Sequence, residues 1–373
     1  MTATLTRRAT LNAVAGGMAA GALGAGPAKA QSFDGAADKN SRKLDRLYDK
    51  SIVVDALSFA KEWDDAEWAA VKQSGYAGII TSLPRRNLQS AIDALVEWRG
   101  RAAAFPDRYM IALRARDFDR AKRAGALAVM MNFQNATMLE GDGDNVEALH
   151  ALGMRCFQLT YNARNLLGDG CTERTDAGLS DFGVEVVARM NKVGVLVDLS
   201  HCGRQTTLDG IAFSQKPVAI THTMVEKFRP GHPRAKTDAQ LKALADKGGV
   251  VGIAALGYFI GVDPGGETTI ETYADHIEHA VNVAGADHVA LSTDFPVRGI
   301  KSWATRETWY EPRLKSFKPS YDVKWPPYIP ALDTPDRFRT LIGVLSARGW
   351  KARQLEDLLG ANWLRLFREV FGS

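Results

Sequence analysis

Cysteine and long apolar runs are both scarce in this sequence. The 373 residues contain three cysteines, Cys156, Cys171 and Cys202, so at most one disulfide can form within the chain. A scaffold held together by several disulfides is therefore excluded. After residue 30 no stretch approaches the roughly 18 uncharged apolar residues that a membrane-spanning helix requires. We therefore expect no membrane span beyond that point.

An excess of one charge is also lacking once the first thirty residues are set aside. Lys and Arg together number 47 and Asp and Glu 43, but Arg7, Arg8 and Lys29 lie in residues 1–30, which contain no acid. Removing these three from the 47 leaves 44 basic residues against 43 acidic ones. With no basic arm and no zinc-finger spacing, this balance argues against a nucleic-acid-binding protein.

The first thirty residues have the parts of an export signal in the usual order. Residues 6–11, Thr-Arg-Arg-Ala-Thr-Leu, have the form of a twin-arginine motif, and an uncharged stretch of apolar and small residues follows at 13–26. Ala28-Lys29-Ala30 then forms a cleavage site of the A-x-A type. The alternative is a disordered, arginine-bearing N-terminus. The pattern predicts a signal peptide over 1–30 and an exported or periplasmic protein over 31–373.

Short apolar runs alternate with amphipathic stretches along the rest of the chain. Strands that read as nearly continuous apolar runs between helices are typical of a parallel sheet covered by helices. Eight of them over about 240 residues favour a closed (β/α)8 TIM barrel in a single domain over a doubly wound sheet. The eight predicted strands are Ile52–Leu57, Gly78–Leu83, Ala128–Gln134, Arg155–Tyr161, Val195–His201, Val218–Thr223, Gly249–Ala255 and His288–Asp294, with Tyr109–Leu113 as a possible ninth. The clearest helices are predicted at Lys43–Lys50, Asp181–Met190, Leu241–Lys247, Asp275–Ala284, Asp336–Arg348 and Ala352–Phe371.

Residues 296–335 interrupt this alternation. The segment is rich in aromatic residues and contains several prolines and basic residues. It follows the last predicted strand, so it should lie at the C-terminal face, where barrel enzymes keep their active sites. We expect a lid or a wall of the binding pocket; a contact between subunits is the alternative.

Histidine is absent before His150, and two of the seven histidines stand at the ends of apolar strands. His201 ends one strand and His222 the next, and Asp294 ends the last one. Side chains at the C-terminal ends of barrel strands point into the mouth of the site, and imidazole is a common metal ligand and general base. The three residues indicate a site, the alternative being satisfied polar groups in the core. His276 and His279, three residues apart on a predicted helix, are expected on a solvated helix face, with a metal pair as the alternative.

At this point the sequence resembles the membrane (renal) dipeptidase family, peptidase family M19. The similar segments follow one another in family order from about residue 52 to the C-terminus. They are Leu159-Thr160-Tyr161-Asn162, Gly178-Leu179-Ser180-Asp181-Phe182-Gly183, Asp198-Leu199-Ser200-His201, Ile220-Thr221-His222, His232-Pro233-Arg234, Gly248-Gly249-Val250-Val251-Gly252 and Ser292-Thr293-Asp294-Phe295.

The resemblance implies an amidohydrolase-type barrel that binds two zinc ions and cleaves dipeptides or related amides. In that family the residues at the positions of His201 and His222 bind one zinc, and a bridging carboxylate stands at the position of Gln134. Asp294 would lie near the other zinc and the reacting water, and Arg234 would hold the substrate carboxylate through paired hydrogen bonds. The family also often forms dimers, so a homodimer is possible.

The chain departs from the family at several of these positions. The first strand of the family ends in a His-x-Asp pair, where this sequence has Leu57 and Phe59. Gln134 is neutral where the family has Glu, and Tyr161 replaces a histidine that contacts the reacting oxygen. A two-zinc site built from the usual ligands is therefore not available.

The residues that remain suggest a hydrolase with one zinc ion. We expect His201, His222 and Gln134 as metal ligands, and Cys171 or Glu173 as a possible replacement ligand. Asp294 is expected to accept the proton of water and Tyr161 to bind the developing oxyanion, while Arg234, Asn162 and Tyr258 bind a small carboxylate-bearing peptide or amide. Two alternatives stay open: a barrel that binds a carboxylate ligand without turnover, and non-hydrolytic chemistry at the same residues.

Overall fold

The computed structural model describes residues 34–261 and 268–372, so the predicted signal peptide at residues 1–30 lies outside them. The chain divides after Asn40 into two units. Residues 34–40 begin helix α1 (Asp34–Lys50), and the unit that starts at Ser41 contains the barrel. Among the described residues, no helix combines the length and the apolar character needed to cross a membrane.

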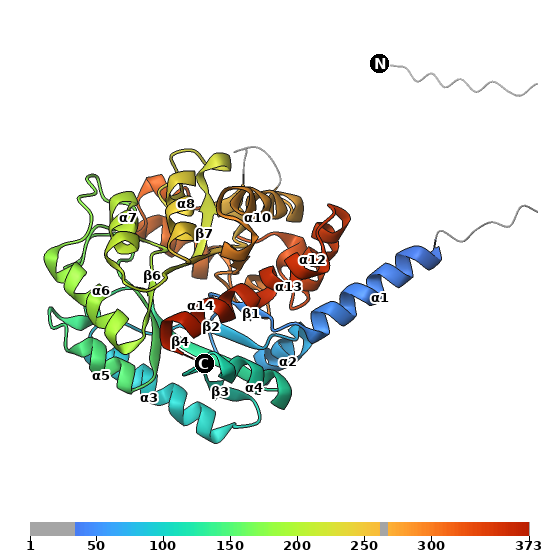
Figure 1. Ribbon diagram of the computed structural model, residues 1–373, viewed down its shortest axis with the longest axis horizontal. Helices are drawn as coiled ribbons and strands as arrows, with labels where there is room; N and C mark the ends of the chain where they lie inside the picture. Colours follow the sequence, from blue (N-terminus) through green and yellow to red (C-terminus); the bar gives the residue numbers. More distant parts are fainter. Residues whose placement is uncertain (1–33, 262–267, 373) are drawn as a thin grey trace, which may run out of the picture. The chain divides into compact units, whose positions relative to one another are not determined.

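Eight parallel strands form this barrel (Figure 1). Each strand pairs in parallel with the next one around the sheet, and two short strands lie off this path: β3 (Tyr109–Ile111) pairs with β4, and β8 (Ala235–Lys236) pairs with β7. In order, the eight are β1 (Val54–Asp55), β2 (Gly78–Ser82), β4 (Leu127–Phe133), β5 (Met154–Gln158), β6 (Leu196–Asp198), β7 (Ala219–Val225), β9 (Val250–Ile253) and β10 (Val289–Leu291).

Hydrogen bonds between the first and last strands bring the ends of the sheet together. The amide of Ala56 donates to the carbonyl of Leu291 at 3.3 Å, and the amide of Asp294 donates to the carbonyl of Leu57 at 2.9 Å. The buried carboxylate of Asp55 accepts from the amide of Thr293 at 2.9 Å. The carboxyl ends of all eight strands therefore meet at one rim, which is where the chemistry of such barrels is found.

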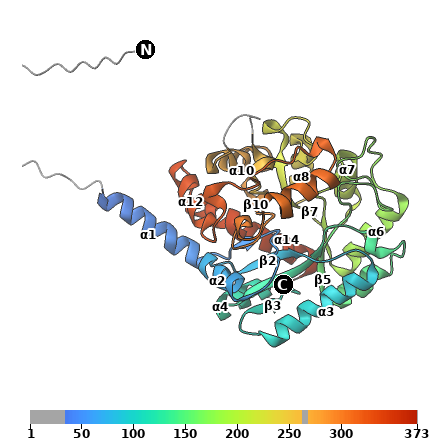
Figure 2. The ribbon, with the colours of Figure 1, turned by 180° about the vertical axis from the view of Figure 1, so that it is seen from behind.

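Helices cover the outside of the strands, as Figures 1 and 2 show from opposite sides. Their boundaries follow local signals: Ser180 caps α6 and Gly194 ends it in a left-handed conformation, while Thr237 and Gln240 form a capping box on α8. The helices are α2 (Asp65–Ser74), α3 (Leu88–Ala104), α4 (Arg116–Ala124), α5 (Asn145–Ala151), α6 (Asp181–Val193), α7 (Arg204–Phe213), α8 (Asp238–Asp246), α9 (Gly257–Ile260), α10 (Ile270–Ala284), α11 (Glu311–Ser316), α12 (Arg337–Ala347), α13 (Ala352–Glu356) and α14 (Asn362–Phe371), with single turns at 137–139, 226–228 and 286–288.

Two apolar layers hold the barrel together. One lies between the strands and the outer helices. The other takes at least one side chain from each of the eight strands, among them Ile80, Met130 and Leu196, together with Trp363 and Phe367 of α14. Helix α14 packs against the end of the barrel opposite the carboxyl rim, because Asn362 donates to the carbonyl of Val289 at the start of β10 at 2.8 Å and Arg365 donates to the carbonyl of Gly248 just before β9 at 2.9 Å. The indole N–H of Trp363 donates to the carbonyl of Leu291 at 3.2 Å.

The predicted (β/α)8 fold and its eight strands are confirmed, and all of the strands except β4 and β7 are shorter than expected. Tyr109–Leu113 contains the additional strand β3, whereas β8 was not predicted. The continuous helix predicted over Ala352–Phe371 is wrong, because residues 357–361 break it at Gly360. A Cβ at that glycine would lie 2.1 Å from the carbonyl oxygen of Ile52, so the chain passes too close there for any side chain.

Segment 296–335 consists of short helical pieces joined by turns. Besides α11 it has turns of helix at 300–302, 306–310, 319–321 and 330–332. Lid behaviour of this segment stays a prediction, and its contribution to the cavity wall is described below.

Candidate active site

Two histidines meet at the carboxyl rim of neighbouring strands. His201 follows β6 and His222 lies within β7, and both side chains are buried. Their Nε2 atoms are 2.9 Å apart. Nδ1 of His201 lies 2.7 Å from Oδ1 of Asn162, and Nδ1 of His222 lies 2.9 Å from Oγ1 of Thr221. Each ring thus has an oxygen partner on one nitrogen and presents the other nitrogen to its neighbour.

A buried carboxylate fixes the orientation of these rings. Oδ2 of Asp198 accepts from the hydroxyl of Thr221 at 2.7 Å, and Oδ1 accepts from the amide of Ser200 at 3.1 Å. Because the Thr221 hydroxyl gives its proton to Asp198, its oxygen accepts from Nδ1–H of His222. When Asn162 Oδ1 likewise accepts from His201, the two Nε2 lone pairs face each other, and a cation at this point relieves their repulsion.

Burial keeps the histidine pair neutral. It lowers the pKa of His201 and of His222 well below the usual value, and the nearby guanidinium of Arg234 lowers both further. Neutral imidazole is the form that binds metal ions. The pair therefore has the protonation state of a metal-binding pair across the neutral pH range.

A cavity of about 410 Å³ opens beside the pair at the carboxyl rim. Of the predicted site residues, Gln134, Tyr161, His201, Tyr258 and Asp294 line it. Four further lining residues come from segment 296–335, namely Trp309, Arg313, Phe317 and Tyr321, and the others are Phe59, Ala60, Ser82, Leu83, Pro84, Arg85 and Leu256.

Tyr161 covers one face of His201 in this cavity. The two rings are stacked with centroids 4.0 Å apart, and the guanidinium of Arg85 also lies over the phenol ring, 4.6 Å from its centroid. Burial raises the pKa of Tyr161 although Arg85 lowers it, so the hydroxyl keeps its proton and can donate a hydrogen bond.

Asp294 enters the cavity from the loop after β10. Its backbone has φ 63°, a conformation that Asp and Asn tolerate better than most residues. Burial raises the pKa of its carboxyl to about 7, while Arg234 and Arg313 lower it. A carboxyl that titrates near neutral pH is suited to accept and return a proton.

Three predicted site residues lie behind the cavity wall. His222 reaches the cavity through His201, and Asn162 contacts His201 rather than lining the cavity. Arg234 is fully buried, and its guanidinium donates to the carbonyls of Ser200 and His222 and to the hydroxyl of Tyr321 at 2.9 Å. Direct contact of Arg234 with a substrate carboxylate stays a prediction.

No group of three or more His, Cys, Asp or Glu side chains within residues 34–261 and 268–372 is arranged to hold a metal ion. Leu57 is fully buried, and Phe59 lines the cavity where the dipeptidase pattern has a ligand. Among the replacement ligands considered, Glu173 accepts from the amide of Arg164 at 3.0 Å, and the Cys171 thiol lies 3.5 Å from Oδ1 of Asn162.

The expectation of a solvated histidine pair on α10 is wrong for His276, and the side chain of His279 is only 11% exposed. His276 is fully buried: its Nδ1 accepts from the amide of Val225 at 3.2 Å, and Nε2 lies 3.0 Å from the carbonyl of Ile260. His279 lies 2.7 Å from Asp238 Oδ1. The spacing of three residues predicted that the two side chains lie near each other, but it did not reveal that Phe228 packs against both rings and that strand β7 contacts His276.

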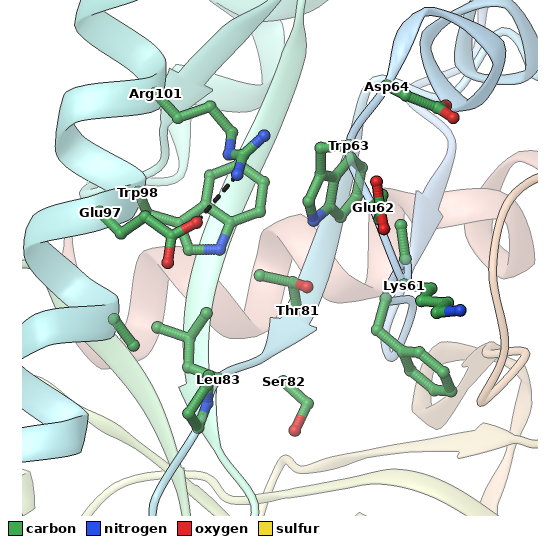
Figure 3. Close-up of a pocket in the computed structure, with 14 residues that line it drawn as sticks. Lys61, Glu62, Trp63, Asp64, Thr81, Ser82, Leu83, Glu97, Trp98 and Arg101 are labelled. Carbon is green, nitrogen blue, oxygen red and sulfur yellow. Dashed lines mark hydrogen bonds and ion pairs between the residues drawn. The ribbon is translucent and has the colours of Figure 1, made fainter.

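A second chamber of about 420 Å³ adjoins the cavity and shares Phe59, Ala60, Ser82, Leu83 and Pro84 with it. Figure 3 shows this chamber, with Trp98, Glu97 and Arg101 of α3 on one side and Lys61, Glu62 and Trp63 on the other. Trp63 and Trp98 meet edge to face at 5.0 Å, and Arg101 is paired with Glu97 at 2.9 Å.

Sequence reasoning missed several residues of the cavity wall. Arg85 lies just past the end of β2, so its place at the carboxyl rim was available as a signal. Arg313 and Tyr321 come from segment 296–335. The sequence of this segment has no helix or strand periodicity from which the direction of its side chains could be predicted.

The sequence pattern of membrane dipeptidase, peptidase family M19, matches residues 38–305. The chain belongs to this family. Its members are metallohydrolases of the dipeptidase type, and the barrel described above is the amidohydrolase barrel of their solved structures.

Several known proteins are similar to this chain over most of its length. An uncharacterized protein in the pqqA 5′ region of Klebsiella pneumoniae is 27% identical over 278 residues, which cover 71% of this chain and 90% of that protein. Dipeptidase tcpJ of Claviceps purpurea is 26% identical over 268 residues, which cover 71% of this chain and 56% of that protein, so this chain spans about half of the fungal enzyme. An amidohydrolase from Pseudomonas aeruginosa superimposes with a TM-score of 0.76 at 31% identity, covering 88% of this chain and 99% of that one.

Proposed function

We propose that this member of the dipeptidase family hydrolyses a small, carboxylate-bearing dipeptide or amide with the help of one zinc ion. The observation that carries the proposal is the His201–His222 pair, whose Nε2 atoms face each other at 2.9 Å beside a cavity lined by Asp294 and Tyr161. The cavity volume of about 410 Å³ lies in the range of small-molecule sites.

The donor set fits one metal ion and does not fit two. His201 and His222 would hold the ion, with an oxygen of Gln134, which lines the same cavity. Leu57 and Phe59 offer no ligand for a second ion. With zinc held there, the site would supply a water whose pKa is lowered toward about 7.

The chain's own groups supply the remaining chemistry. Asp294 takes up the proton of the attacking water, for which its pKa of about 7 is suitable, and can return it to the leaving amine. Tyr161 donates a hydrogen bond to the developing oxyanion, because its hydroxyl stays protonated. Tyr258, whose pKa burial also raises, lies in the same wall and can orient the substrate.

The twin-arginine pattern at residues 6–11 supports export of this enzyme, and we propose that it acts in the periplasm or outside the cell. Twin-arginine export carries folded proteins, in keeping with a metal loaded before export. Fusion of residues 1–30 to a reporter tests this directly: export that fails when Arg7 and Arg8 are both replaced by Lys supports the proposal, and export that persists contradicts it.

Hydrolysis of a dipeptide panel tests the catalytic proposal. We expect the wild type to hydrolyse at least one dipeptide, a chelator to abolish this activity and added zinc to restore it. The His222→Ala variant should have no activity, although it should unfold at a temperature close to that of the wild type. Binding of substrate without turnover in the zinc-loaded wild type would instead favour the ligand-binding protein. Turnover unaffected by metal removal would contradict the zinc mechanism.

A further inference from the structure

Two arginines in the wall of the main cavity have no acidic partner among the described residues. Arg85 contacts the ring of Tyr161. Arg313 of α11 lies over the ring of Trp309 at 4.1 Å, and its Nη1 donates to the carbonyl of Trp309 at 2.9 Å. Both arginines are partly buried. Arg313 acts on the carboxyl of Asp294, whose pKa it lowers, but it forms no ion pair with it. A partly buried cation that lacks an ion-pair partner loses hydration, and a bound anion can compensate for this loss.

Several arginines elsewhere in the described chain do have acidic partners. In the adjoining chamber, Arg101 forms an ion pair with Glu97 (Figure 3). On the barrel surface, Arg348 contacts Glu271, Asp275 and Glu278. Arg85 and Arg313 line the main cavity and have no such ion pair within residues 34–261 and 268–372.

The charges of the two spaces differ accordingly. The main cavity is lined by two arginines and one carboxyl, that of Asp294, whereas the chamber of Figure 3 is lined by three acids (Glu62, Asp64 and Glu97) and two bases (Lys61 and Arg101). The guanidinium of Arg234 adds positive charge directly behind Tyr321. An anion is thus attracted to the main cavity, and a cation or a free amino group is repelled from the arginine side of it.

We propose that the substrate carries two carboxylates, one bound by Arg85 and the other by Arg313, so that the enzyme acts on acidic dipeptides or related dicarboxylic amides. This inference rests on the proposed hydrolase function and specifies the class of substrate that the enzyme prefers. A neutral dipeptide is a zwitterion with one carboxylate, which leaves one arginine unpaired. A dipeptide containing Asp or Glu supplies two carboxylates, and guanidinium groups bind carboxylates through paired, charge-assisted hydrogen bonds.

Matched pairs of substrates test the specificity. We compare kcat/KM for Ala-Glu with that for Ala-Gln, which has nearly the same shape and lacks the second charge. A hydrogen bond to a charged group contributes about 1.5–3 kcal/mol, so we expect a preference of roughly tenfold or more for Ala-Glu, expressed mainly in KM. Arg85→Gln and Arg313→Gln should each lose most of this preference, measured as the ratio of kcat/KM for the two dipeptides within each variant.

Arg86→Gln is the matched control, because Arg86 is exposed, adjacent to Arg85 and not part of the cavity wall. It should keep the full preference. Equal kcat/KM for the two dipeptides in the wild type, or a preference that both cavity variants retain, overturns the proposal.

Calorimetric binding separates failure of this inference from failure of the hydrolase. If no dipeptide is cleaved, glutarate and its monoamide are titrated into the wild type and the same three variants. Glutarate bound more tightly than the monoamide, with the difference lost in Arg85→Gln and Arg313→Gln, supports the dicarboxylate site without any turnover. Equal or undetectable binding of the two compounds overturns it.

Discussion

At the scale of single residues, the site combines a neutral histidine pair with a carboxyl that titrates near pH 7. Burial produces both, since it disfavours the charged forms of His201, His222 and Asp294. The same low-polarity surroundings keep Tyr161 protonated. Burial thus gives these four residues the protonation states that the proposed hydrolysis requires: neutral histidines, a carboxyl that titrates near pH 7 and a protonated tyrosine.

Asp294→Asn tests the proton-accepting role through pH. Asp294 must be ionised to accept a proton, so wild-type kcat/KM should rise as pH increases through about 7. Asn fits the backbone at φ 63° and cannot take up a proton. We expect the variant to lose at least a hundredfold in kcat, which is the usual contribution of a general base. A variant with near wild-type activity and the same pH profile would contradict the role.

The same substitution has a stability signature of defined sign. The pKa of Asp294 is higher in the folded protein, at about 7, than its usual value of 3.8, so the folded state binds the proton more strongly than the unfolded one. This contribution to stability is present below pH 4 and is lost as pH rises through about 7. In thermal unfolding of the metal-free protein, Asp294→Asn should therefore gain stability relative to wild type between pH 5 and pH 8. A difference that is independent of pH would contradict the raised pKa.

Thr221 is expected to act on metal binding through His222. Thr221→Val removes the oxygen that accepts from Nδ1 of His222 and the hydroxyl that donates to Asp198. Loss of such an orienting partner typically weakens metal affinity about 10–100-fold. Zinc titration measures the change, and Thr221→Ser, which keeps the hydroxyl, is the control. Equal affinity in the valine and serine variants would show that Thr221 does not orient the histidine.

At the scale of elements, the strands were predictable because parallel strands buried on both faces read as apolar runs. Strand β8 escaped prediction, since its two residues include the buried Lys236, whose amine donates to the carbonyl of Cys202 at 3.0 Å. The C-terminal helix was predicted as continuous because Gly360 is tolerated in a helical pattern. The close approach of Ile52, more than 300 residues away along the chain, breaks the helix there.

Gly360→Ala tests the importance of this close approach. The added Cβ would lie 2.1 Å from the carbonyl oxygen of Ile52, so backbone must shift at the junction of α13 and α14. Overpacking of this kind costs about 1–3 kcal/mol in the free energy of unfolding. Gly343→Ala in α12 is the control, because a Cβ there meets no atom within 4 Å. Denaturant unfolding should show a loss for the first variant only, and equal stabilities would contradict the assigned packing.

At the scale of the whole molecule, the barrel could be predicted from the sequence more completely than the site. Successive strands place His201, His222 and Asp294 at one rim, and the structure has all three there. Arg85 could have been placed at this rim, because it lies just past the end of β2. The position of Arg313 depends on how segment 296–335 folds back over the rim, which no local pattern encodes. Whether a buried arginine such as Arg234 faces the substrate or the protein likewise depends on its partners, here Tyr321 and two carbonyl groups.

The metal content of the mature protein tests the central claim most directly. Elemental analysis of the wild type should give about one zinc per chain, and the matched variant His201→Ala should have lost it while remaining folded. Two metals per chain would mean that ligands other than those described rebuild the second site. No zinc in a wild-type protein that still hydrolyses dipeptides would contradict the account.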